Sequence, residues 1–523
     1  MHRHSVVNVQ SGLLISFCAA ILLWTAVLPL ARAFQLEQIN YNEGWNVYNA
    51  MKVAEHQLLY ATVYDWTSVN YPALSFHLIA ALGNSPSSYL FAGRILSLLG
   101  LCLGGIFAGL IVWQVTREKM VAWLSGMFLV AIFCANATDY IGMDDPQMLA
   151  LGLFIAGLYV YVRGGGRGWT LDLTALLFVL GGNIKHNPIE FPLAVLLDLL
   201  LSSPRKALRY AAVGGLLAAF SVVLTSHIDG SAYVSCLLAP RQCSWKSIPA
   251  KLYIVLVPIL LPVAAAWRTS FFCWKNPAQR VLSLLLFCAM AVDAFFSGGV
   301  GVVINALFGS MVAIVLLCGV FWAEFSRMPL GRFRALPQAV VCAFFFLWLA
   351  APMFLSRDTA DFDENQHSYG SATQKPDLAQ RFAAHIALSI SDGNWRTMRA
   401  LRLSQNGERY FATDVAYLRR QPGLALCEDL LQCAVAGKPY LYDPFNATRF
   451  INLGKLDANV IVDRLRDGDY GAVQIDRSSE QGLSQGHADS RFALPILLSI
   501  QKYYRPGLMD EGEVIYIPKK QGQ

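Results

Sequence analysis

A few acidic residues stand out in this sequence because the apolar segments around them do not require them. Glu43 lies in a polar stretch at 34–88, and Asp144 and Asp145 directly precede a long apolar run. A positioned carboxylate can act as general base when a hydroxyl group attacks carbon, and it can stabilise an oxocarbenium-like transition state. These residues predict Glu43 as a base or as an acid that orients a substrate, with Asp144 assisting it.

Basic residues occur beside the same segments, at positions where an isolated charge is costly. Lys185 and His186 interrupt two short apolar runs, and Arg94 lies about one helical turn inside another. Ionisable residues at membrane depth are functional candidates by default. Lys185 and Arg94 could neutralise the charge that develops on a leaving phosphate, and Lys185 with His186 would hold that phosphate. The alternative is that the long side chains of Lys185 and Arg94 reach the membrane surface and have no chemical role.

Ordinary structural roles compete with a chemical role at two of the acids. Glu43 could cap a helix at the membrane surface, and Asp145 followed by Pro146 is a common way to begin a helix. Asp144 has no comparable structural role in the sequence pattern. Asp145 is also predicted to contribute to substrate binding.

Two further residues complete the predicted binding set. Tyr71 suits a segment in the headgroup layer, and Asn305 is a polar residue early in an apolar run. No cysteine pair has the spacing of a zinc site. Glu43, Asp65 and Asp144 could ligate a hard divalent cation, but their spacing does not require one. The sequence therefore demands no cofactor.

The composition indicates the class of protein. Of the 523 residues, 55% are hydrophobic and 15% are charged. Soluble domains carry roughly 25% charged residues. One core cannot bury so much apolar surface, so much of the chain must face lipid. The net charge of +6 comes without a basic run interleaved with aromatic residues, which argues against nucleic acid as a partner.

Apolar runs define the expected membrane spans, because a helix that crosses the hydrocarbon core needs about 20 apolar residues. Eleven runs are expected to cross, at 11–33, 89–115, 120–137, 147–163, 170–185, 188–202, 207–226, 251–267, 279–296, 302–323 and 337–355. Basic residues follow every even-numbered run, for example Arg117, Arg163 and Lys206. Basic loops are cytoplasmic. The N-terminus is therefore predicted to be cytoplasmic, and residues 34–88 and everything after 356 are predicted to lie outside.

Two features of these expected outer segments leave alternatives open. The first run could be a cleaved signal peptide ending near 31–33, but its apolar stretch is longer than such peptides usually have. An uncleaved span is therefore favoured. Cys236 and Cys243 could form a disulfide outside the cytoplasm, and Cys427 and Cys433 could form another or remain buried thiols.

The last part of the chain has the composition of a soluble domain. Residues 1–356 are predicted to form a transmembrane domain, and residues 357–523 an extracytoplasmic α/β domain with a mainly parallel sheet. Strands are predicted at Leu424–Glu428, Pro439–Tyr442, Ala472–Ile475 and Val514–Ile517, helices at Leu378–Ile390, Leu430–Ala436, Val460–Arg466 and Ala493–Tyr503, and a turn at 443–446. The domain would cover the active site or hold the acceptor, or it would serve only for docking or stability.

Five short motifs carry a family resemblance. They are NEGWNVYNA at 42–50, VNYPALS at 69–75, Gly93-Arg94, Asp144-Asp145-Pro146, and GGVGVVINALF at 298–308. With the span pattern over about 10–355, they resemble bacterial members of the glycosyltransferase C superfamily, in the branch of protein O-mannosyltransferases and the lipid A aminoarabinose transferase.

The resemblance implies a multi-span helical fold and a polyprenyl-phosphate sugar donor used at the outer face. It also implies an acid in the first outer loop, which Glu43 matches, with Asp65 as a second acid. The mannosyltransferase pattern places Asp before Glu after the first span, whereas Asn42 precedes Glu43 here. The resemblance therefore does not identify the acceptor.

The sequence thus predicts a glycosyltransferase of the bacterial inner membrane that transfers a sugar from a polyprenyl-phosphate donor to an acceptor hydroxyl group. Its partners would be that donor, membrane lipid, and a glycan, lipid or protein acceptor. The alternative is a transporter or a flippase for lipid-linked sugars. Such a protein should place polar residues near the membrane midplane, and only Asp293 and Asn305 approach that depth.

Overall fold

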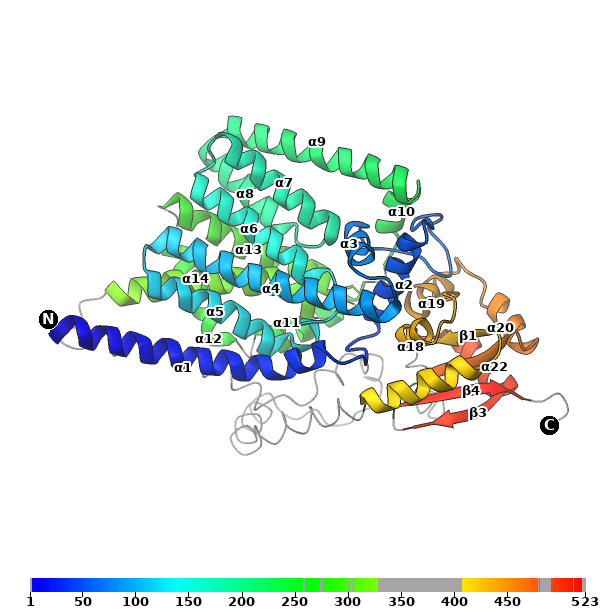
Figure 1. The fold of residues 1–523 in the computed structure, drawn as a ribbon. Helices are drawn as coiled ribbons and strands as arrows, with labels where there is room; N and C mark the ends of the chain where they lie inside the picture. Colours follow the sequence, from blue (N-terminus) through cyan, green and yellow to red (C-terminus); the bar gives the residue numbers. More distant parts are fainter. Residues whose placement is uncertain are drawn as a thin grey trace.

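The structure is a computed structural model that is mostly helical, with a small four-stranded sheet near the C-terminus (Figure 1). The residues that it describes are 2–241, 243–256, 259–272, 274, 276–299, 302, 304–327, 407–477, 479, 491–510 and 512–519. The predicted domain boundary at 356 and the predicted helix Leu378–Ile390 lie outside the described residues.

Seven helical stretches are long and apolar enough to cross a membrane. They belong to α1 (His2–Ala33), α4 (Pro86–Thr116), α5 (Lys119–Asn136), α6 (Gln147–Gly164), α9 (Pro204–Asp229), α13 (Pro277–Ser297) and α14 (Phe308–Arg327), the last preceded by a 3-10 turn at Ile304–Leu307. The chain is therefore a multi-pass membrane protein, as its composition predicts.

The remaining expected runs have different outcomes. The two short runs form separate helices, α7 (Gly168–Ile184) and α8 (Glu190–Ser202). The run expected at 251–267 includes most of α11 (Ile248–Leu256) and the first part of α12 (Leu260–Phe272), and residues 257 and 258 between them lie outside the described residues. The last run, 337–355, lies outside the described residues, so the total of eleven spans stays a prediction.

The helices have two distinct ends. The N-terminus and the basic turns after α4, α6 and α8 lie at one end in Figure 1. At the other end, which we call the loop end, lie α2 (Asn42–Ala54), α3 (Leu74–Leu82), α10 (Tyr233–Leu237) and the C-terminal sheet (Figure 1). The basic turns are thus collected on one side, as their alternation in the sequence predicts.

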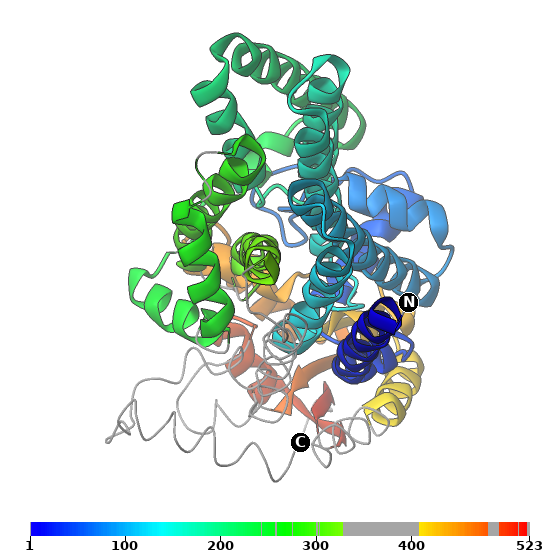
Figure 2. The ribbon, with the colours of Figure 1, turned by 90° about the vertical axis from the view of Figure 1, so that its left-hand side faces the viewer.

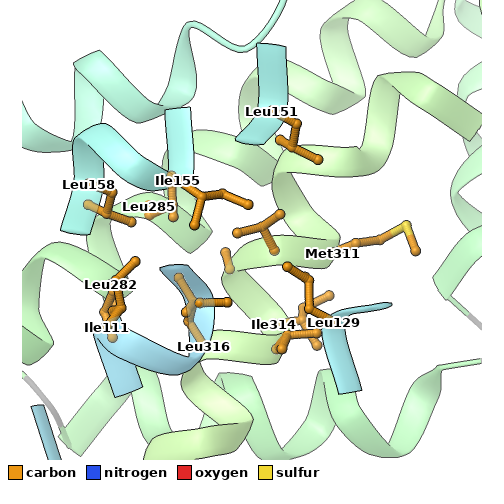
Figure 3. Packing of buried hydrophobic residues seen from close by; sticks show 14 of the residues in the cluster. Ile111, Leu129, Leu151, Ile155, Leu158, Leu282, Leu285, Met311, Ile314 and Leu316 are labelled. Carbon is orange, nitrogen blue, oxygen red and sulfur yellow. The ribbon is translucent and has the colours of Figure 1, made fainter. Parts of the chain in front are cut away.

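The helical core is built around α14, the most buried of the candidate spans, which runs through the middle of the helices in Figure 2. Its Ile314 lies near Leu129 of α5 in the apolar cluster of Figure 3. Small residues let α4 and α6 pack closely, since a Cβ atom at Gly152 would lie 2.6 Å from the carbonyl oxygen of Gly100. This packed core holds the loop-end segments in place.

The C-terminal sheet contains β1 (Leu424–Cys427), β2 (Tyr470–Asp476), β3 (Tyr504–Met509) and β4 (Glu513–Pro518), in the order β1-β2-β4-β3. β1 and β2 are parallel, whereas β4 is antiparallel to both β2 and β3. The prediction of a mainly parallel sheet is therefore wrong, because β3 and β4 form a hairpin that the sequence analysis did not detect. The predicted strand Pro439–Tyr442 is also wrong, since this segment is irregular.

Helices surround this sheet at the positions that the sequence largely predicts. They are α18 (Leu430–Val435), α19 (Pro444–Asn452), α20 (Asn459–Arg466), α22 (Leu494–Tyr503) and a helix through 407–420. The predicted turn at 443–446 is instead the start of α19, where the Asp443 carboxylate accepts hydrogen bonds from the amides of Phe445 and Asn446 at 3.0 Å. Capping by a side chain and a turn involve the same residue types, which explains the error.

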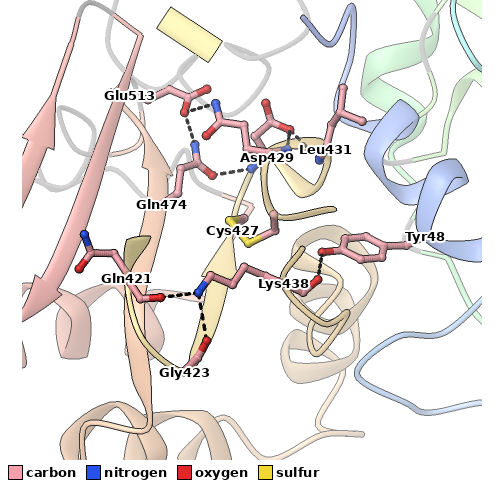
Figure 4. Close-up of a disulfide and its surroundings, with 11 residues drawn as sticks. Tyr48, Gln421, Gly423, Cys427, Asp429, Leu431, Lys438, Gln474 and Glu513 are labelled. Atoms are coloured by element: carbon pink, nitrogen blue, oxygen red, sulfur yellow. Dashed lines mark hydrogen bonds between the residues drawn. A yellow bond between two sulfur atoms is a disulfide. The ribbon is translucent and has the colours of Figure 1, made fainter. Parts of the chain in front are cut away.

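The C-terminal region packs directly on α2 through α18. The disulfide between Cys427 and Cys433 joins β1 to α18 (Figure 4), so of the two alternatives that the sequence left open, a bond or buried thiols, the bond is the one present. Near it, the Tyr48 hydroxyl of α2 donates a hydrogen bond to the carbonyl of Lys438 at 2.8 Å. Gly44 gives α18 room, since a Cβ atom there would lie 2.2 Å from the backbone nitrogen of Leu431.

The second expected disulfide does not form. Cys236 and Cys243 are both free. Cys236 is buried in α10 and its thiol donates to the carbonyl of Thr62 at 3.5 Å, whereas Cys243 is exposed and its backbone forms a bridge with Gly299. The two cysteines are thus held by different neighbouring segments.

The Gly44 contact generates a stability prediction. Gly44→Ala should lower the free energy of unfolding by about 1–3 kcal/mol, because the added methyl group meets backbone atoms of α18. It should also increase protease cleavage within 407–519. Thermal unfolding and limited proteolysis of the full chain in detergent measure both effects.

Gly215→Ala is the matched control, because a Cβ atom at Gly215 of α9 has no neighbour within 4 Å. That variant should unfold at the wild-type temperature or slightly above it, since Ala favours helix more than Gly. Equal behaviour of the two variants would contradict close packing of α18 on α2.

Candidate active site

Glu43 is fully buried near the start of α2, surrounded by hydrogen-bond donors. Its Oε1 accepts from Arg94 Nε at 2.7 Å and from the amide of Asp144 at 2.8 Å. Its Oε2 accepts from Arg94 Nη2 at 2.7 Å and from the amide of Ile39 at 2.6 Å. Paired contact of guanidinium and carboxylate is a strong form of charge-assisted hydrogen bond. Four donors occupy both oxygens, which suits a positioning role better than the role of a base.

Arg94 projects from α4 and connects Glu43 to the end of α1. Its Nη2 donates to the carbonyl of Glu37 at 2.7 Å, and its Nη1 donates to the carbonyls of Gln35 and Arg32. Arg32 lies in the last turn of α1, where a cation satisfies unpaired carbonyl groups and the helix dipole. The buried cation at Arg94 is therefore paired and satisfied by the protein itself.

Asp144 lies beside this ion pair but has a different environment. Its carbonyl accepts a hydrogen bond from the Asn46 side chain, and its carboxylate packs on Gly93, where a Cβ atom would lie 1.8 Å from Oδ1. The residue is 1% exposed, and neither carboxylate oxygen has a hydrogen-bond partner in the part of the chain that the structure describes. Burial raises the pKa of Asp144 well above its usual value, the charge of Glu43 raises it further, and Arg94 opposes the increase. Asp144 therefore holds its proton more strongly than an ordinary carboxyl group.

Lys185 follows α7 and lies at the loop end beside Asp145. Its Nζ is 3.5 Å from Asp145 Oδ2 and 3.3 Å from the centre of the Tyr71 ring. The other oxygen of Asp145 accepts from the amide of Gln147 at 2.8 Å, so Asp145 also begins α6 as predicted. Burial lowers the pKa of Lys185 to about 8, Asp145 opposes this decrease, and Arg241 adds to it. The long ion-pair distance leaves the ammonium group available to a better acceptor.

His186 adds a polar donor or acceptor next to Lys185. Its Nδ1 atom is buried without a hydrogen-bond partner. Burial, together with the charges of Arg241 and Lys185, lowers the pKa of His186 to about 3. The imidazole is therefore neutral at pH 7, and it can bind a ligand through a hydrogen bond rather than through charge.

A cavity lies at the loop end, among segments that are far apart in the sequence. It is lined by Tyr41, Asn42, Trp45, Asn70, Tyr71, Tyr140, Arg241, Asn305, Asp443, Phe445 and Asn446. Two of the predicted binding residues, Tyr71 and Asn305, belong to this lining. Asp144 lies behind the wall formed by the first turn of α2, whose Asn46 contacts it.

The C-terminal region forms one wall of the cavity through α19. The amide of Asp443 donates to the carbonyl of Trp66 at 2.6 Å, and the Asn70 side chain donates to Asn446 Oδ1 at 3.4 Å. Burial raises the pKa of Asp443, although hydrogen bonds from Asn446 oppose the increase. The first loop and α19 therefore close the cavity together.

Asp65 is the one predicted acid that does not join the others. It is partly exposed, and its carboxylate accepts from the amide of Trp66 at 2.7 Å. Burial lowers the pKa of Lys52, and the charge of Asp65 opposes this decrease. Among the described residues, no group of three or more His, Cys, Asp or Glu side chains is arranged to hold a metal ion. Glu43 and Asp144 are neighbours, but the three acids do not form one ligand set.

The sequence analysis missed several residues of the cavity. Arg241 is a single cation in a loop with no recognisable pattern, and Asp443 and Asn446 lie beyond the part of the chain that carries the family resemblance. The one signal for Arg241 was its position in an expected outer loop. Nothing in the local sequence indicates that α19 approaches the first loop.

The chain resembles known proteins in structure but not in sequence. No family model and no curated protein matches it. The crystal structure titled ArnT from Cupriavidus metallidurans bound to undecaprenyl phosphate has a TM-score of 0.57 at 12% identity, covering 98% of this chain and 99% of that one. The apo structure of the same ArnT has a TM-score of 0.57 at 11% identity, covering 95% and 97%. The archaeal oligosaccharyltransferase AglB from Archaeoglobus fulgidus has a lower TM-score of 0.48 at 9% identity, covering 97% and 74%.

The similarity to ArnT extends over nearly the whole length of both chains. ArnT is an aminoarabinose transferase with the glycosyltransferase C fold. The fold expected from the resemblance, including a small α/β region after the membrane helices, is therefore confirmed. At this sequence identity the similarity shows the fold alone.

The contrast between the two buried acids generates a stability prediction. Glu43→Gln should lower the free energy of unfolding by about 3–5 kcal/mol, because it leaves the buried cation of Arg94 without its counter-charge. Asp144→Asn should change it by less than about 1 kcal/mol at pH values below the raised pKa of Asp144, because Asn resembles the neutral carboxyl group that burial favours. Thermal unfolding of the full chain in detergent compares them.

The dependence on pH provides the control for this pair. In the unfolded chain Asp144 loses its proton near the ordinary carboxyl pKa of about 3.9, whereas in the folded chain it keeps the proton to a higher pH. The free energy of unfolding of the wild type should therefore decrease as the pH rises from about 3.9 to the raised pKa of folded Asp144. Asp144→Asn should lack the part of this decrease that is due to Asp144. A larger loss of stability in Asp144→Asn than in Glu43→Gln would contradict the assignment.

Proposed function

We propose that this chain is a membrane glycosyltransferase that transfers a sugar from a polyprenyl-phosphate donor to an acceptor hydroxyl group. The observation that carries the proposal is a set of basic residues beside the loop-end cavity: Arg241 lines it, and Lys185, which precedes His186, lies over the ring of the lining residue Tyr71. Buried acids lie directly behind the wall of this cavity. The ArnT structure that shares the fold is bound to undecaprenyl phosphate. The charges of the site and the fold thus favour the same class of donor.

Lys185, His186 and Arg241 are assigned to the donor phosphate. Lys185 has a weakly held partner in Asp145, His186 has an unpartnered ring nitrogen, and Arg241 lines the cavity. Lys185 is buried at the loop end between α7 and α8, with its ammonium group 3.3 Å from the centre of the ring of Tyr71, which lines the cavity. In a site with little water, these groups stabilise the charge on the departing phosphate more strongly than they would in solution.

The transfer forms one bond and breaks another at the anomeric carbon. The acceptor oxygen bonds to this carbon while the bond from carbon to the phosphate oxygen breaks, and polyprenyl phosphate leaves with the bonding electrons. The proton of the acceptor hydroxyl group passes to a carboxylate. We assign this role to Asp144, because both of its oxygens lack hydrogen-bond partners. Glu43 is a positioning residue, since it fixes Arg94 and the amide of Asp144.

The orientation follows from the basic turns. These turns and the N-terminus lie opposite the loop end, and basic loops mark the cytoplasmic side of a membrane. We therefore assign the chain to the bacterial inner membrane with its N-terminus in the cytoplasm. The cavity and the C-terminal region then lie outside, where a sugar from the lipid carrier meets a glycan, lipid or protein acceptor.

The alternative of a transporter or flippase depended on polar residues near the membrane midplane. Asp293 lies in the last turns of α13, and its carboxylate accepts a hydrogen bond from the amide of Ser310 at 2.8 Å, near the start of α14. Asn305 lines the loop-end cavity. Both residues therefore have roles near one membrane surface, which supports an enzyme at that surface.

Activity of the purified full chain tests the assignment of Asp144. Asp144→Asn should lower the turnover of a labelled polyprenyl-phosphate sugar about 10²–10⁴-fold, as is usual when a general base is removed. Wild-type turnover should rise with pH through the raised pKa of Asp144, because only the deprotonated form accepts the proton. Asp145→Asn is the comparison, and a greater loss there than in Asp144→Asn would assign the base to Asp145.

Binding of the carrier lipid tests the cations. Lys185→Gln should weaken binding of undecaprenyl phosphate roughly tenfold or more, because a charge-assisted contact to phosphate is lost. Lys119→Gln, an exposed residue at the opposite end of α5, should bind as the wild type does. If vesicles containing the wild type move the labelled lipid intact and never cleave its sugar, the chain is a transporter and the proposed function is wrong.

A further inference from the structure

A cation of the C-terminal region, Arg449, lies close to the cavity and packs over the ring of Phe450, 4.7 Å from its centre. Arg449 is on α19, three and four residues beyond the cavity-lining Asn446 and Phe445. Residues at this spacing share one face of a helix. The Arg449 side chain is 9% exposed, and its Nε and Nη2 atoms are buried without hydrogen-bond partners.

The charged groups near Arg449 do not accept hydrogen bonds from its Nε and Nη2 atoms. The nearest cation is Arg241, whose charge adds to the effect of burial in lowering the pKa of Arg449 to about 10. Asp443 and Tyr41 oppose this decrease. The Asp443 carboxylate, however, already accepts hydrogen bonds from the amides of Phe445 and Asn446 and from the Asn446 side chain. A buried guanidinium with two N–H groups that no described residue accepts is unfavourable until an anion joins it.

We propose that Arg449 and Arg241 form a second anion subsite at the α19 wall of the cavity, which binds a phosphate or carboxylate group other than the phosphate held at Lys185. A planar guanidinium with two free donors matches the two oxygens of such a group. The inference rests on the proposed function and adds to it. The substrate pair carries a second oxyanion, either on the acceptor or on the transferred sugar.

The two subsites occupy different walls. Lys185 lies in the turn between α7 and α8, with Asp145 and Tyr71 as its contacts. Arg449 lies on the C-terminal helix α19, and Arg241 acts electrostatically on both. The phosphate of a lipid carrier is confined to the membrane surface, whereas the polar part of the sugar or the acceptor can extend toward α19. Arg241 therefore lies where the two bound groups meet.

Sequential binding to the purified full chain in detergent tests the second subsite. The wild type is first saturated with undecaprenyl phosphate, and inorganic phosphate is then added as the probe, with calorimetry and thermal unfolding as readouts. We expect a second binding event. Arg449→Gln should weaken this event roughly tenfold or more while binding undecaprenyl phosphate as the wild type does, and Lys185→Gln should weaken the lipid event. Arg449→Lys retains the charge and should restore part of the second event.

The controls separate the possible results. Arg505→Gln, an exposed arginine of β3, should leave both events unchanged. If the wild type binds the lipid but no further phosphate, or if Arg449→Gln weakens the lipid as much as Lys185→Gln does, the second subsite is refuted. If the wild type does not bind the lipid at all, the proposed function fails instead.

A pair of donors identifies the source of the second oxyanion. Binding of a polyprenyl phosphate that carries a uronic acid is compared with binding of one that carries a neutral hexose. A loss in Arg449→Gln that is confined to the uronic acid donor assigns the oxyanion to the transferred sugar. Unchanged binding of both donors, together with loss of the phosphate event, assigns it to the acceptor. Equal weakening of both donors would show that Arg449 holds the donor phosphate, which contradicts two subsites.

Discussion

The buried ion pair between Glu43 and Arg94 is the interaction on which the loop end depends. It joins the end of α1, the start of α2, the first part of α4 and the segment before α6 through hydrogen bonds to a single carboxylate and a single guanidinium. Removing one partner of such a pair is far more costly than the pair is stabilising, because the other charge stays buried. The pair therefore specifies one arrangement of these segments, and that arrangement fixes the position of Asp144.

The same region of α2 also anchors the C-terminal region. Gly44 follows Glu43 directly and lies against the backbone of α18, and Tyr48, one turn later, donates to the carbonyl of Lys438. One short helix thus contacts the membrane helices with one residue and the C-terminal region with the next. A displacement of α18 would reach the ion pair through α2, so the two walls of the cavity are mechanically connected.

The sequence allowed prediction of features that depend on periodicity and on sidedness. Hydropathy predicted the spans, and the alternation of basic turns placed Glu43, Asp144 and Lys185 at one end, where Glu43 and Asp144 are in contact and Asp145 joins Lys185. The sequence could not reveal which charged residues form pairs, because the ion pair of Glu43 and Arg94 joins residues that are 51 positions apart. Arg241 has no pattern around it. The hairpin of β3 and β4 was missed because β3 contains Pro506 and Gly507, which usually disfavour a strand.

Two neighbouring acids in different environments provide a physical basis for different roles. Glu43 has four donors and a paired cation, whereas Asp144 is buried against Gly93 with no donor to its carboxylate. Such separation of environments is how a protein makes one carboxyl group structural and raises the pKa of another, so that it keeps its proton to a higher pH. Asn46 of α2 donates to the carbonyl of Asp144, and α2 itself contacts both α4 and α18. The position of Asp144 among the membrane helices is therefore linked through α2 to the position of the C-terminal region.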